Sequence, residues 1–199
     1  MIVAGGKASR LGGRIKALLD IDGRTMLDRL LDVLAPRFAA LAISANDALP
    51  FASHGLPVLA DQIPDQGPLA GILSALQWCR ESYLLVVPCD MPFLDGRIVD
   101  LLLARRAPGV DAIVPFVNDL PEPLLALYHQ RCTGALAARL QQGKYKASGL
   151  VTDEGLNVYR VQESEIRAVD PHLDCLTNIN SQADLERAIS RLRCERGVA

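Results

Sequence analysis

Glycines and basic side chains alternate near the start of the chain. Residues 4–16 read Ala-Gly-Gly-Lys-Ala-Ser-Arg-Leu-Gly-Gly-Arg-Ile-Lys, with four glycines and four cations. Glycine lets a backbone approach a phosphate closely, while Lys and Arg neutralise its charge. The order matches neither a P-loop nor a dinucleotide-binding GxGxxG motif. A glycine turn without a ligand is the alternative, but the interleaved cations favour a phosphate-binding loop.

A carboxylate follows a continuous apolar run further along the chain. Residues 83–88 read Tyr-Leu-Leu-Val-Val-Pro, which is typical of a central strand covered on both faces, and Asp90 follows closely. In open parallel sheets, ligands bind beyond the carboxyl ends of the strands. Asp90 could there hold a divalent cation together with phosphate oxygens, or it could cap a helix. Beside a phosphate-binding loop, the metal site is the favoured interpretation.

Asn46 and Asp61 each follow a predicted strand. Either side chain could hydrogen-bond a base edge or a ribose hydroxyl. The alternative for both is an Asx turn or a helix cap, and it is strong when each residue is considered alone.

The elements that must position these residues follow the pattern of repeated βα units. Short apolar runs predict strands at 1–4, 39–44, 57–60, 83–88 and 112–115, and an extended segment at 123–128. Helical periodicity covers 25–34, 69–80, 97–106, 133–141 and 184–193, whereas 144–151 and 157–161 match neither pattern. We therefore predict a single-domain, Rossmann-like, three-layer α/β/α fold over residues 1–199 with a mostly parallel central sheet.

Composition excludes several classes of protein. Half of the residues are hydrophobic and the net charge is −2, which disfavours nucleic acid as a partner. No apolar run of about 18 residues and no signal peptide is evident, so we expect no membrane partner and a cytoplasmic location. Five scattered cysteines predict reduced, mostly buried thiols, and three isolated histidines predict surface or structural roles.

Several blocks in the chain together resemble the molybdenum cofactor guanylyltransferase family. They span nearly the whole chain in the family's order, so the combination is more specific than any one block. The blocks are Ala-Gly-Gly-x-x-x-Arg-Leu-Gly-Gly-x-x-Lys at 4–16, Ser-Ala-Asn at 44–46, Gly-Pro-Leu-Ala-Gly-Ile at 67–72, Pro-Cys-Asp-Met-Pro at 88–92, Pro-Glu-Pro-Leu-Leu-Ala-Leu-Tyr at 121–128 and Asn-Ile-Asn at 178–180.

The resemblance implies that GMP is transferred from GTP to molybdopterin, with release of pyrophosphate and formation of the guanine dinucleotide cofactor. It implies a nucleotide-binding half over about 1–95 and an acceptor-binding half over about 96–199. Alignment and charge neutralisation would suffice, without a covalent nucleophile. The resemblance implies that the triphosphate is held by Gly5, Gly6, Arg10 and Lys16, and that Mg²⁺ is held by Asp90. It implies that the guanosine part contacts Val3, Ala4, Asn46 and Asp61, and that the pterin contacts Asn178, Asn180 and residues 144–146. The catalytic residues would be Arg10, Lys16 and Asp90.

Two departures from the family pattern and two alternative functions remain open at this stage. Many relatives carry methionine at the position of Leu11 and aspartate at that of Ile15. The chain could instead use CTP or another phosphorylated acceptor, or it could deliver cofactor without catalysis. Molybdoenzyme chaperones or other cofactor-biosynthesis proteins are further expected partners. Turnover with GTP against CTP decides the base, and pyrophosphate release distinguishes an enzyme from a delivery module.

Overall fold

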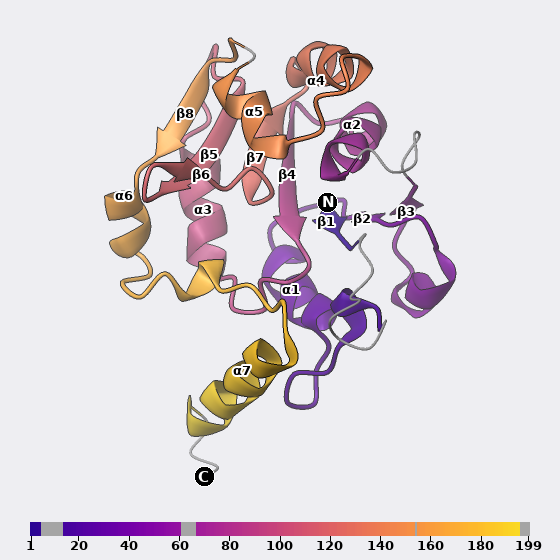
Figure 1. Ribbon diagram of the computed structural model, residues 1–199, viewed down its shortest axis with the longest axis vertical. Helices are drawn as coiled ribbons and strands as arrows, with labels where there is room; N and C mark the ends of the chain where they lie inside the picture. Colours follow the sequence, from indigo (N-terminus) through magenta and orange to yellow (C-terminus); the bar gives the residue numbers. More distant parts are fainter. Residues whose placement is uncertain (5–13, 61–66, 154, 196–199) are drawn as a thin grey trace.

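A mixed β-sheet forms the centre of the protein (Figure 1). The computed structural model describes residues 1–4, 14–60, 67–153 and 155–195. The strand order is β3-β2-β1-β4-β7-β5-β6, and β8 pairs with β5. The strands are β1 (Ile2–Val3), β2 (Ile43–Ser44), β3 (Val58–Leu59), β4 (Tyr83–Pro88), β5 (Ala112–Val117), β6 (Leu120–Pro121), β7 (Ala126–His129) and β8 (Val158–Val161).

One half of the sheet is parallel and the other half is mixed. Strands β3, β2, β1 and β4 pair in parallel. Strand β7 is antiparallel to both β4 and β5, β6 is antiparallel to β5, and β8 is parallel to β5. The predicted α/β fold with a mostly parallel sheet is therefore confirmed, with β7 inserted in the opposite direction between β4 and β5.

Helices cover both faces of the sheet because the strand side chains alternate. In β4, Leu85 and Val87 belong to a core shared with α1 and α3, whereas Leu84 and Val86 belong to a core shared with α2, α4 and α5. The helices are α1 (Met26–Leu34), α2 (Pro68–Trp78), α3 (Gly96–Ala104), α4 (Cys132–Gln141), α5 (Ala147–Thr152), α6 (Glu163–Arg167) and α7 (Gln182–Glu195), with 3₁₀ turns η2 (Lys16–Leu18), η3 (Leu49–His54) and η4 (Asp174–Leu176).

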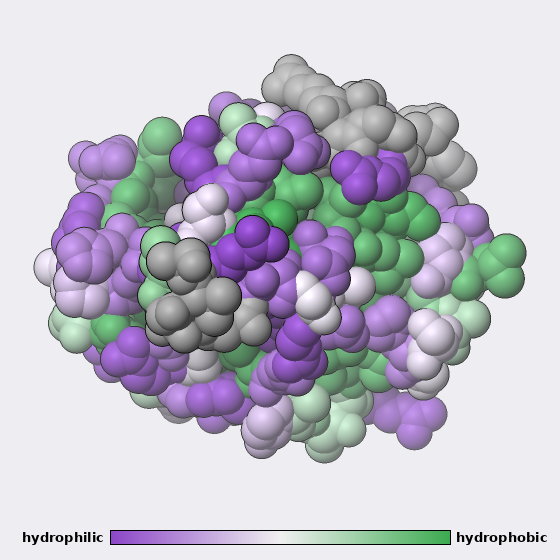
Figure 2. Space-filling view, turned by 90° about the horizontal axis from the view of Figure 1, so that it is seen from below, coloured by the Kyte–Doolittle hydropathy of each residue, from purple (hydrophilic) through white to green (hydrophobic). Residues whose placement is uncertain are grey.

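Helix α7 lies away from the sheet at one end of the molecule (Figure 1). Leu185 and Ala188 on its inner face join Ile179 in a small core with Leu19 and Ile21, near the start of the chain. Seen from below, mainly hydrophilic residues cover this end, with apolar groups visible between them (Figure 2). The last helix therefore ties the segment before it to the N-terminal part of the fold.

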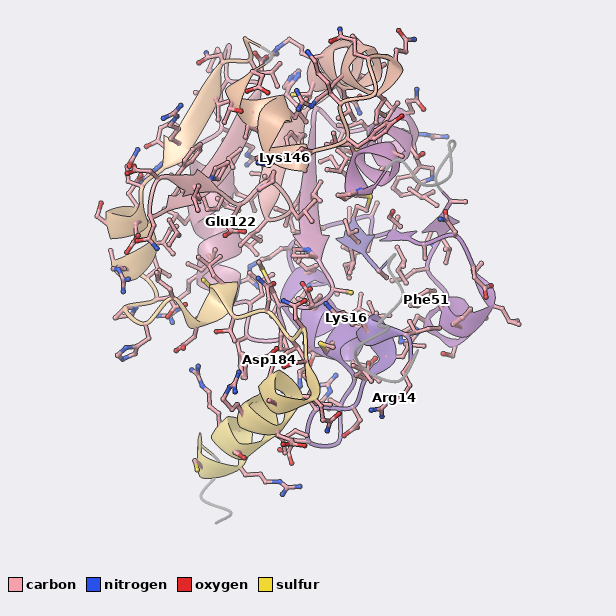
Figure 3. All side chains as sticks on the ribbon, in the orientation of Figure 1. Arg14, Lys16, Phe51, Glu122, Lys146 and Asp184 are labelled. Carbon is pink, nitrogen blue, oxygen red and sulfur yellow. The ribbon has the colours of Figure 1, made fainter. Side chains whose placement is uncertain are left out.

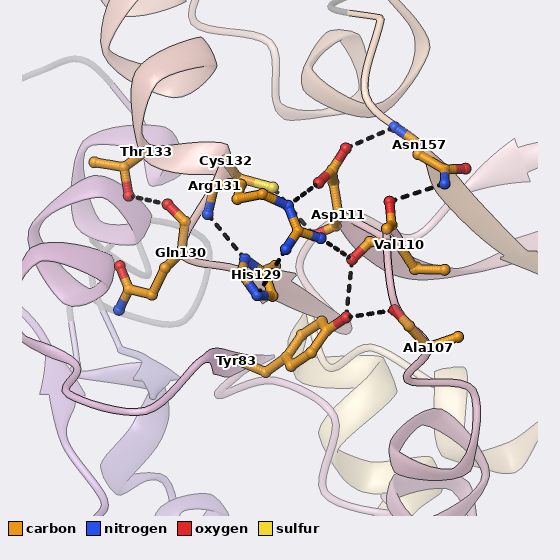
Figure 4. Close-up of polar contacts among 11 residues, drawn as sticks. Tyr83, Ala107, Val110, Asp111, His129, Gln130, Arg131, Cys132, Thr133 and Asn157 are labelled. Carbon is orange, nitrogen blue, oxygen red and sulfur yellow. Dashed lines mark hydrogen bonds and ion pairs between the residues drawn. The ribbon is translucent and has the colours of Figure 1, made fainter.

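A polar cluster closes the amino end of β4 (Figure 4). The Tyr83 hydroxyl donates to the Val110 carbonyl at 2.8 Å, and the Arg131 guanidinium donates to the Asp111 carboxylate at 2.7 Å. The backbone N–H of Arg131 donates to His129 Nδ1 at 3.0 Å. Partial burial, and then the charge of Arg131, lowers the pKa of His129 below its usual range. These bonds join β4, β5 and β7 at the end of the sheet opposite Asp90.

The sequence predicted most elements with shifted ends. The second strand is shorter than expected, at Ile43–Ser44 rather than 39–44. The two segments without a clear pattern contain α5 and β8. All five cysteines are free and three are buried, which confirms the expectation of mostly buried thiols. In the described ranges, no helix is both long enough and apolar enough to cross a membrane.

Candidate active site

Asp90 lies where three segments of the chain meet. It is the second residue after β4, and the N–H of the preceding Cys89 donates to the carbonyl of Val3 in β1 at 3.0 Å. The carbonyl of Asp90 accepts a hydrogen bond from Ile179 at 2.9 Å. Because Ile179 is fully buried, this bond fixes residues 178–180 against the end of β4. The Asp90 carboxylate is thus presented at the carboxyl edge of the parallel strands.

Lys16 contacts Asp90 and Asn180 at the same time. Its Nζ donates to Asp90 Oδ2 at 2.9 Å and to Asn180 Oδ1 at 2.6 Å. The side chains of Lys16 and Asp90 are each 20% exposed, so the ion pair is partly shielded from water. The neighbouring Ala17 is fully buried, which anchors the short 3₁₀ turn η2 that carries Lys16.

The start of α7 orients Asn180. The N–H groups of Asn180 and Ser181 donate to Asp184 Oδ2 at 3.0 and 2.8 Å, and the Ser181 hydroxyl donates to the same oxygen at 2.8 Å. The Ser181 hydroxyl, followed by the Asn180 N–H, lowers the pKa of Asp184. This carboxylate therefore stays ionised and holds the turn in which Asn180 faces Lys16.

Two oxygens converge on one cationic nitrogen at this point. A carboxylate and an amide oxygen are ligands that Mg²⁺ prefers, and Mg²⁺ commonly completes its shell with water and phosphate oxygens. The part of the chain that the structure describes contains no cluster of three or more His, Cys, Asp or Glu side chains arranged to hold a metal ion. Asp90 and Asn180 thus fit a metal that is held by few protein ligands and by its substrate.

The thiol next to Asp90 is buried and poorly ionised. Cys89 is buried, and burial raises the pKa of its thiol to about 12, with a further contribution from Asp90. A protonated thiol is a poor nucleophile. Cys89 is therefore a poor candidate for a covalent nucleophile.

Val3, Ala4 and Asn46 share the sheet edge that carries Asp90. Val3 pairs with Ser44 and with Pro88 across the parallel strands, and the Ala4 N–H donates to the Ser44 carbonyl at 2.9 Å. Ala4 is buried, Val3 is half-buried, and Asn46 is exposed just after β2. These three positions therefore lie on the β1–β2 side of Asp90. Four other predicted site residues, Gly5, Gly6, Arg10 and Asp61, lie outside the described residues.

The residues predicted for the pterin side fall into two groups. Asn180 contacts Lys16, and Asn178 is exposed on the same segment. Residues 144–146 are exposed before α5, and the Tyr145 carbonyl lies close to Gly67 at the start of α2. Figure 3 shows Lys146 beside α5 and well separated from Lys16. The structure brings Asn180 to Asp90 but leaves residues 144–146 apart from it.

Glu122 was not among the predicted site residues, although it lies in the Pro-Glu-Pro-Leu-Leu-Ala-Leu-Tyr block at 121–128. Glu122 follows β6 and is half-buried. Burial, and then the nearby charge of Asp90, raises the pKa of its carboxyl group above the usual range. The acid between two prolines, in the Pro-Glu-Pro order of residues 121–123, was the available signal. Because proline fixes its own φ angle, the two prolines restrict the backbone on both sides of Glu122.

The known proteins to which this chain is similar include a family of nucleotidyltransferases. The model of the MobA-like NTP transferase domain matches residues 1–155. The molybdenum cofactor guanylyltransferase of Desulfosudis oleivorans is 32% identical over 196 residues, which cover 98% of this chain and 96% of the relative. A protein of the same name from Cereibacter sphaeroides is 34% identical over 97% of this chain and 96% of the relative. This chain belongs to the molybdenum cofactor guanylyltransferase family. Its predicted enzyme class, nucleotidyltransferase, is confirmed.

Solved structures agree with membership of the guanylyltransferase family. The molybdopterin-guanine dinucleotide biosynthesis protein A of Archaeoglobus fulgidus superposes with a TM-score of 0.83 at 28% identity, over 98% of this chain and 97% of that protein. The guanylyltransferase fold therefore extends beyond the family-model match into α7, the element that positions Asn180.

Proposed function

We propose that this protein transfers GMP from GTP to molybdopterin and releases pyrophosphate, which forms the guanine dinucleotide cofactor. Membership of the guanylyltransferase family supports this reaction. The single observation that carries it is the meeting of Lys16, Asp90 and Asn180 at the carboxyl edge of the parallel strands. Such an edge is where open α/β sheets bind nucleotides.

The reaction needs alignment and charge neutralisation. An oxygen of the acceptor's terminal phosphate attacks the α-phosphorus of GTP, and the bond from that phosphorus to the bridging oxygen of the β-phosphate breaks. Asp90 and Asn180 would hold Mg²⁺, which supplies neutralisation of phosphate oxygens when bound. The Lys16 ammonium would turn from Asp90 towards the phosphates and offset the charge that develops on pyrophosphate.

The nucleotide contacts in this proposal come from the phosphate-binding loop and the β1–β2 edge. Gly5, Gly6 and Arg10 would hold the triphosphate with Lys16. The guanosine part would be received by Val3, Ala4, Asn46 and Asp61. The cytoplasmic location, and cofactor-biosynthesis proteins or chaperones as partners, stay predictions from the sequence.

The direct test is anaerobic incubation of the purified protein with GTP, Mg²⁺ and molybdopterin, followed by mass analysis of the product and measurement of pyrophosphate. We expect one pyrophosphate for each guanine dinucleotide formed, and no product without Mg²⁺. Preferential turnover of CTP would reject guanine as the base. Binding of both substrates without pyrophosphate release would reject catalysis and support a delivery module.

A further inference from the structure

The backbone around Glu122 is held in place from several sides. Its N–H donates to the Pro115 carbonyl at 2.9 Å, and its own carbonyl accepts from Leu125 at 3.1 Å. Proline stands on both sides, which fixes the neighbouring backbone torsions. The Tyr128 hydroxyl donates to the Pro123 carbonyl at 2.7 Å. The position of the Glu122 α-carbon is therefore set by the fold before any ligand binds.

The β5–β6 hairpin supplies the rest of this support. Its two loop residues, Asn118 and Asp119, have φ angles of 49° and 61°, the left-handed conformation that a tight two-residue turn requires. The Asn118 N–H donates to the Glu163 carboxylate of α6 at 3.0 Å. Because the tip of the hairpin is bonded to α6, and Glu122 directly follows β6, the hairpin limits movement of the Glu122 backbone.

The Glu122 carboxylate has no such support. Among the described residues, it makes no hydrogen bond or ion pair, although it is half-buried. The charge that affects it most is that of Asp90, which is of the same sign. A partly desolvated carboxylate beside a like charge is unfavourable unless a donor or a cation meets it. Glu122 thus combines a fixed backbone with a partly desolvated acid near Asp90, which makes it a candidate for ligand binding.

The order of the strands identifies which substrate this acid faces. Val3 and Asn46 lie on the β1–β2 side of Asp90, whereas Glu122 lies on the other side, in the short segment that connects β6 to β7, the strand that pairs with β4. In Figure 3, Glu122 lies between β6 and the region of Lys16, and Phe51 marks the opposite side of the site. A nucleotide on the β1–β2 side leaves the Glu122 side for the acceptor.

We propose that Glu122 is a specificity-determining residue for the acceptor and binds the 2-amino-4-oxopyrimidine ring of a pterin. This inference rests on the proposed function, because it assumes that the acceptor is a pterin. A pterin ring presents an amino N–H and a ring N–H side by side, and two carboxylate oxygens can accept both as parallel hydrogen bonds. These bonds would replace the missing partners of Glu122.

Two small heterocycles test the contact directly. Pterin carries the 2-amino group, whereas lumazine has an oxygen in its place and cannot donate there. We expect wild-type protein to bind pterin about 10- to 100-fold more tightly than lumazine in calorimetric titrations, because a site built for a donor rejects an analogue that lacks it. Equal affinity of wild-type protein for the two rings would overturn the proposal.

The matched variants are Glu122→Gln and Glu81→Gln. Glu81 is exposed and adjoins the opposite end of β4, so its variant reports any general effect of removing one negative charge. Glu122→Gln should bind the two rings with equal affinity and bind GTP with Mg²⁺ as wild type does, whereas Glu81→Gln should keep the preference for pterin. A Glu122→Gln protein that retains the preference, or that loses affinity for GTP or Mg²⁺ instead, would contradict the assignment.

Kinetics separate this inference from the proposed function. In the transfer reaction, Glu122→Gln should raise the KM for molybdopterin about 10-fold or more and leave the KM for GTP unchanged. If wild-type protein forms no guanine dinucleotide, the proposed function fails. If wild-type protein turns over and the KM for molybdopterin is unchanged in Glu122→Gln, only the role of Glu122 fails.

Discussion

The ammonium group of Lys16 lies 2.9 Å from Asp90 Oδ2 and bridges this carboxylate to Asn180 Oδ1 at 2.6 Å. The three side chains come from the N-terminal region, the end of β4 and the start of α7. The positive charge of Lys16 therefore occupies the point at which two oxygens could hold a divalent cation. In the proposed reaction, metal binding and the release of Lys16 towards a phosphate would be parts of one exchange.

Replacement of Asp90 tests the metal site. Asp90→Ala removes the only carboxylate at the Lys16 contact in the described part of the chain, and we expect turnover to fall by about 100-fold or more. The fold should be retained because Asp90 holds residues 178–180 through its backbone carbonyl. Pyrophosphate release measures the first effect and circular dichroism the second. Asp32→Ala, at an exposed ion pair with Arg24, is the control. Near-normal turnover in Asp90→Ala would reject the metal assignment.

Removal of the Lys16 charge should act in opposite directions on metal binding and on turnover. In Lys16→Met, Asp90 and Asn180 lose their shared cation, so Mg²⁺ should bind several-fold more tightly in the absence of nucleotide. Transfer should nevertheless slow by about 100-fold, because no ammonium group offsets the charge on pyrophosphate. Titration with Mn²⁺, monitored by electron paramagnetic resonance, gives the affinity. Unchanged or weaker metal binding would show that Lys16 does not compete for the site.

Local sequence patterns were sufficient to predict the strand β4 and the position of Asp90. A continuous apolar run predicted β4 as a buried strand, and the position of Asp90 at its end followed directly. The contact between Lys16 and Asn180 joins residues 164 positions apart, through the packing of α7 against the N-terminal segment. No short-range periodicity carries that information, so Asn180 was assigned to the pterin side without its contact to Lys16.

The acceptor side was harder to predict for similar reasons. The apolar residues of 123–128 indicated an extended segment but not its direction, and β7 proved antiparallel to its neighbours. Helix α5 has six residues, too few for a helical period to stand out. Among the described strands, β8 pairs only with β5, and three of its four residues are at least partly exposed, which weakens the hydrophobic pattern. Glu122 was overlooked because its proposed role depends on burial near Asp90 and on the lack of a partner among the described residues, neither of which the sequence shows.

The cluster at the amino end of β4 predicts a pH-dependent stability. His129 accepts the Arg131 N–H through Nδ1, and its pKa in the folded protein is below the unfolded value of about 6.5. As the pH falls, His129 therefore binds a proton at a higher pH in the unfolded chain than in the folded protein. The free energy of unfolding should decrease as the pH falls below about 6.5. Asp111, whose pKa is lowered from 3.8, contributes only in more acidic solution.

Urea unfolding of wild type and His129→Gln between pH 7.5 and 5 measures this effect. The variant should lose less stability than wild type over the range, because glutamine does not titrate. Equal slopes for the two proteins would show that His129 is not the group responsible.

The two helical glycines Gly149 and Gly134 offer a matched test of packing near the acceptor side. A Cβ built on Gly149 would overlap Arg139 Nη2, whereas a Cβ on Gly134 has no described neighbour within 4 Å. Arg139 is 4% exposed and its Nη2 donates to the Lys146 carbonyl, so the guanidinium cannot move aside without breaking that bond. Gly149→Ala should therefore lower the free energy of unfolding by about 1–3 kcal/mol. Gly134→Ala should raise it by up to about 1 kcal/mol, because alanine favours the helix and meets no neighbour. Urea unfolding of both variants checks the difference, and a stabilised Gly149→Ala protein would show that Arg139 is not confined as described.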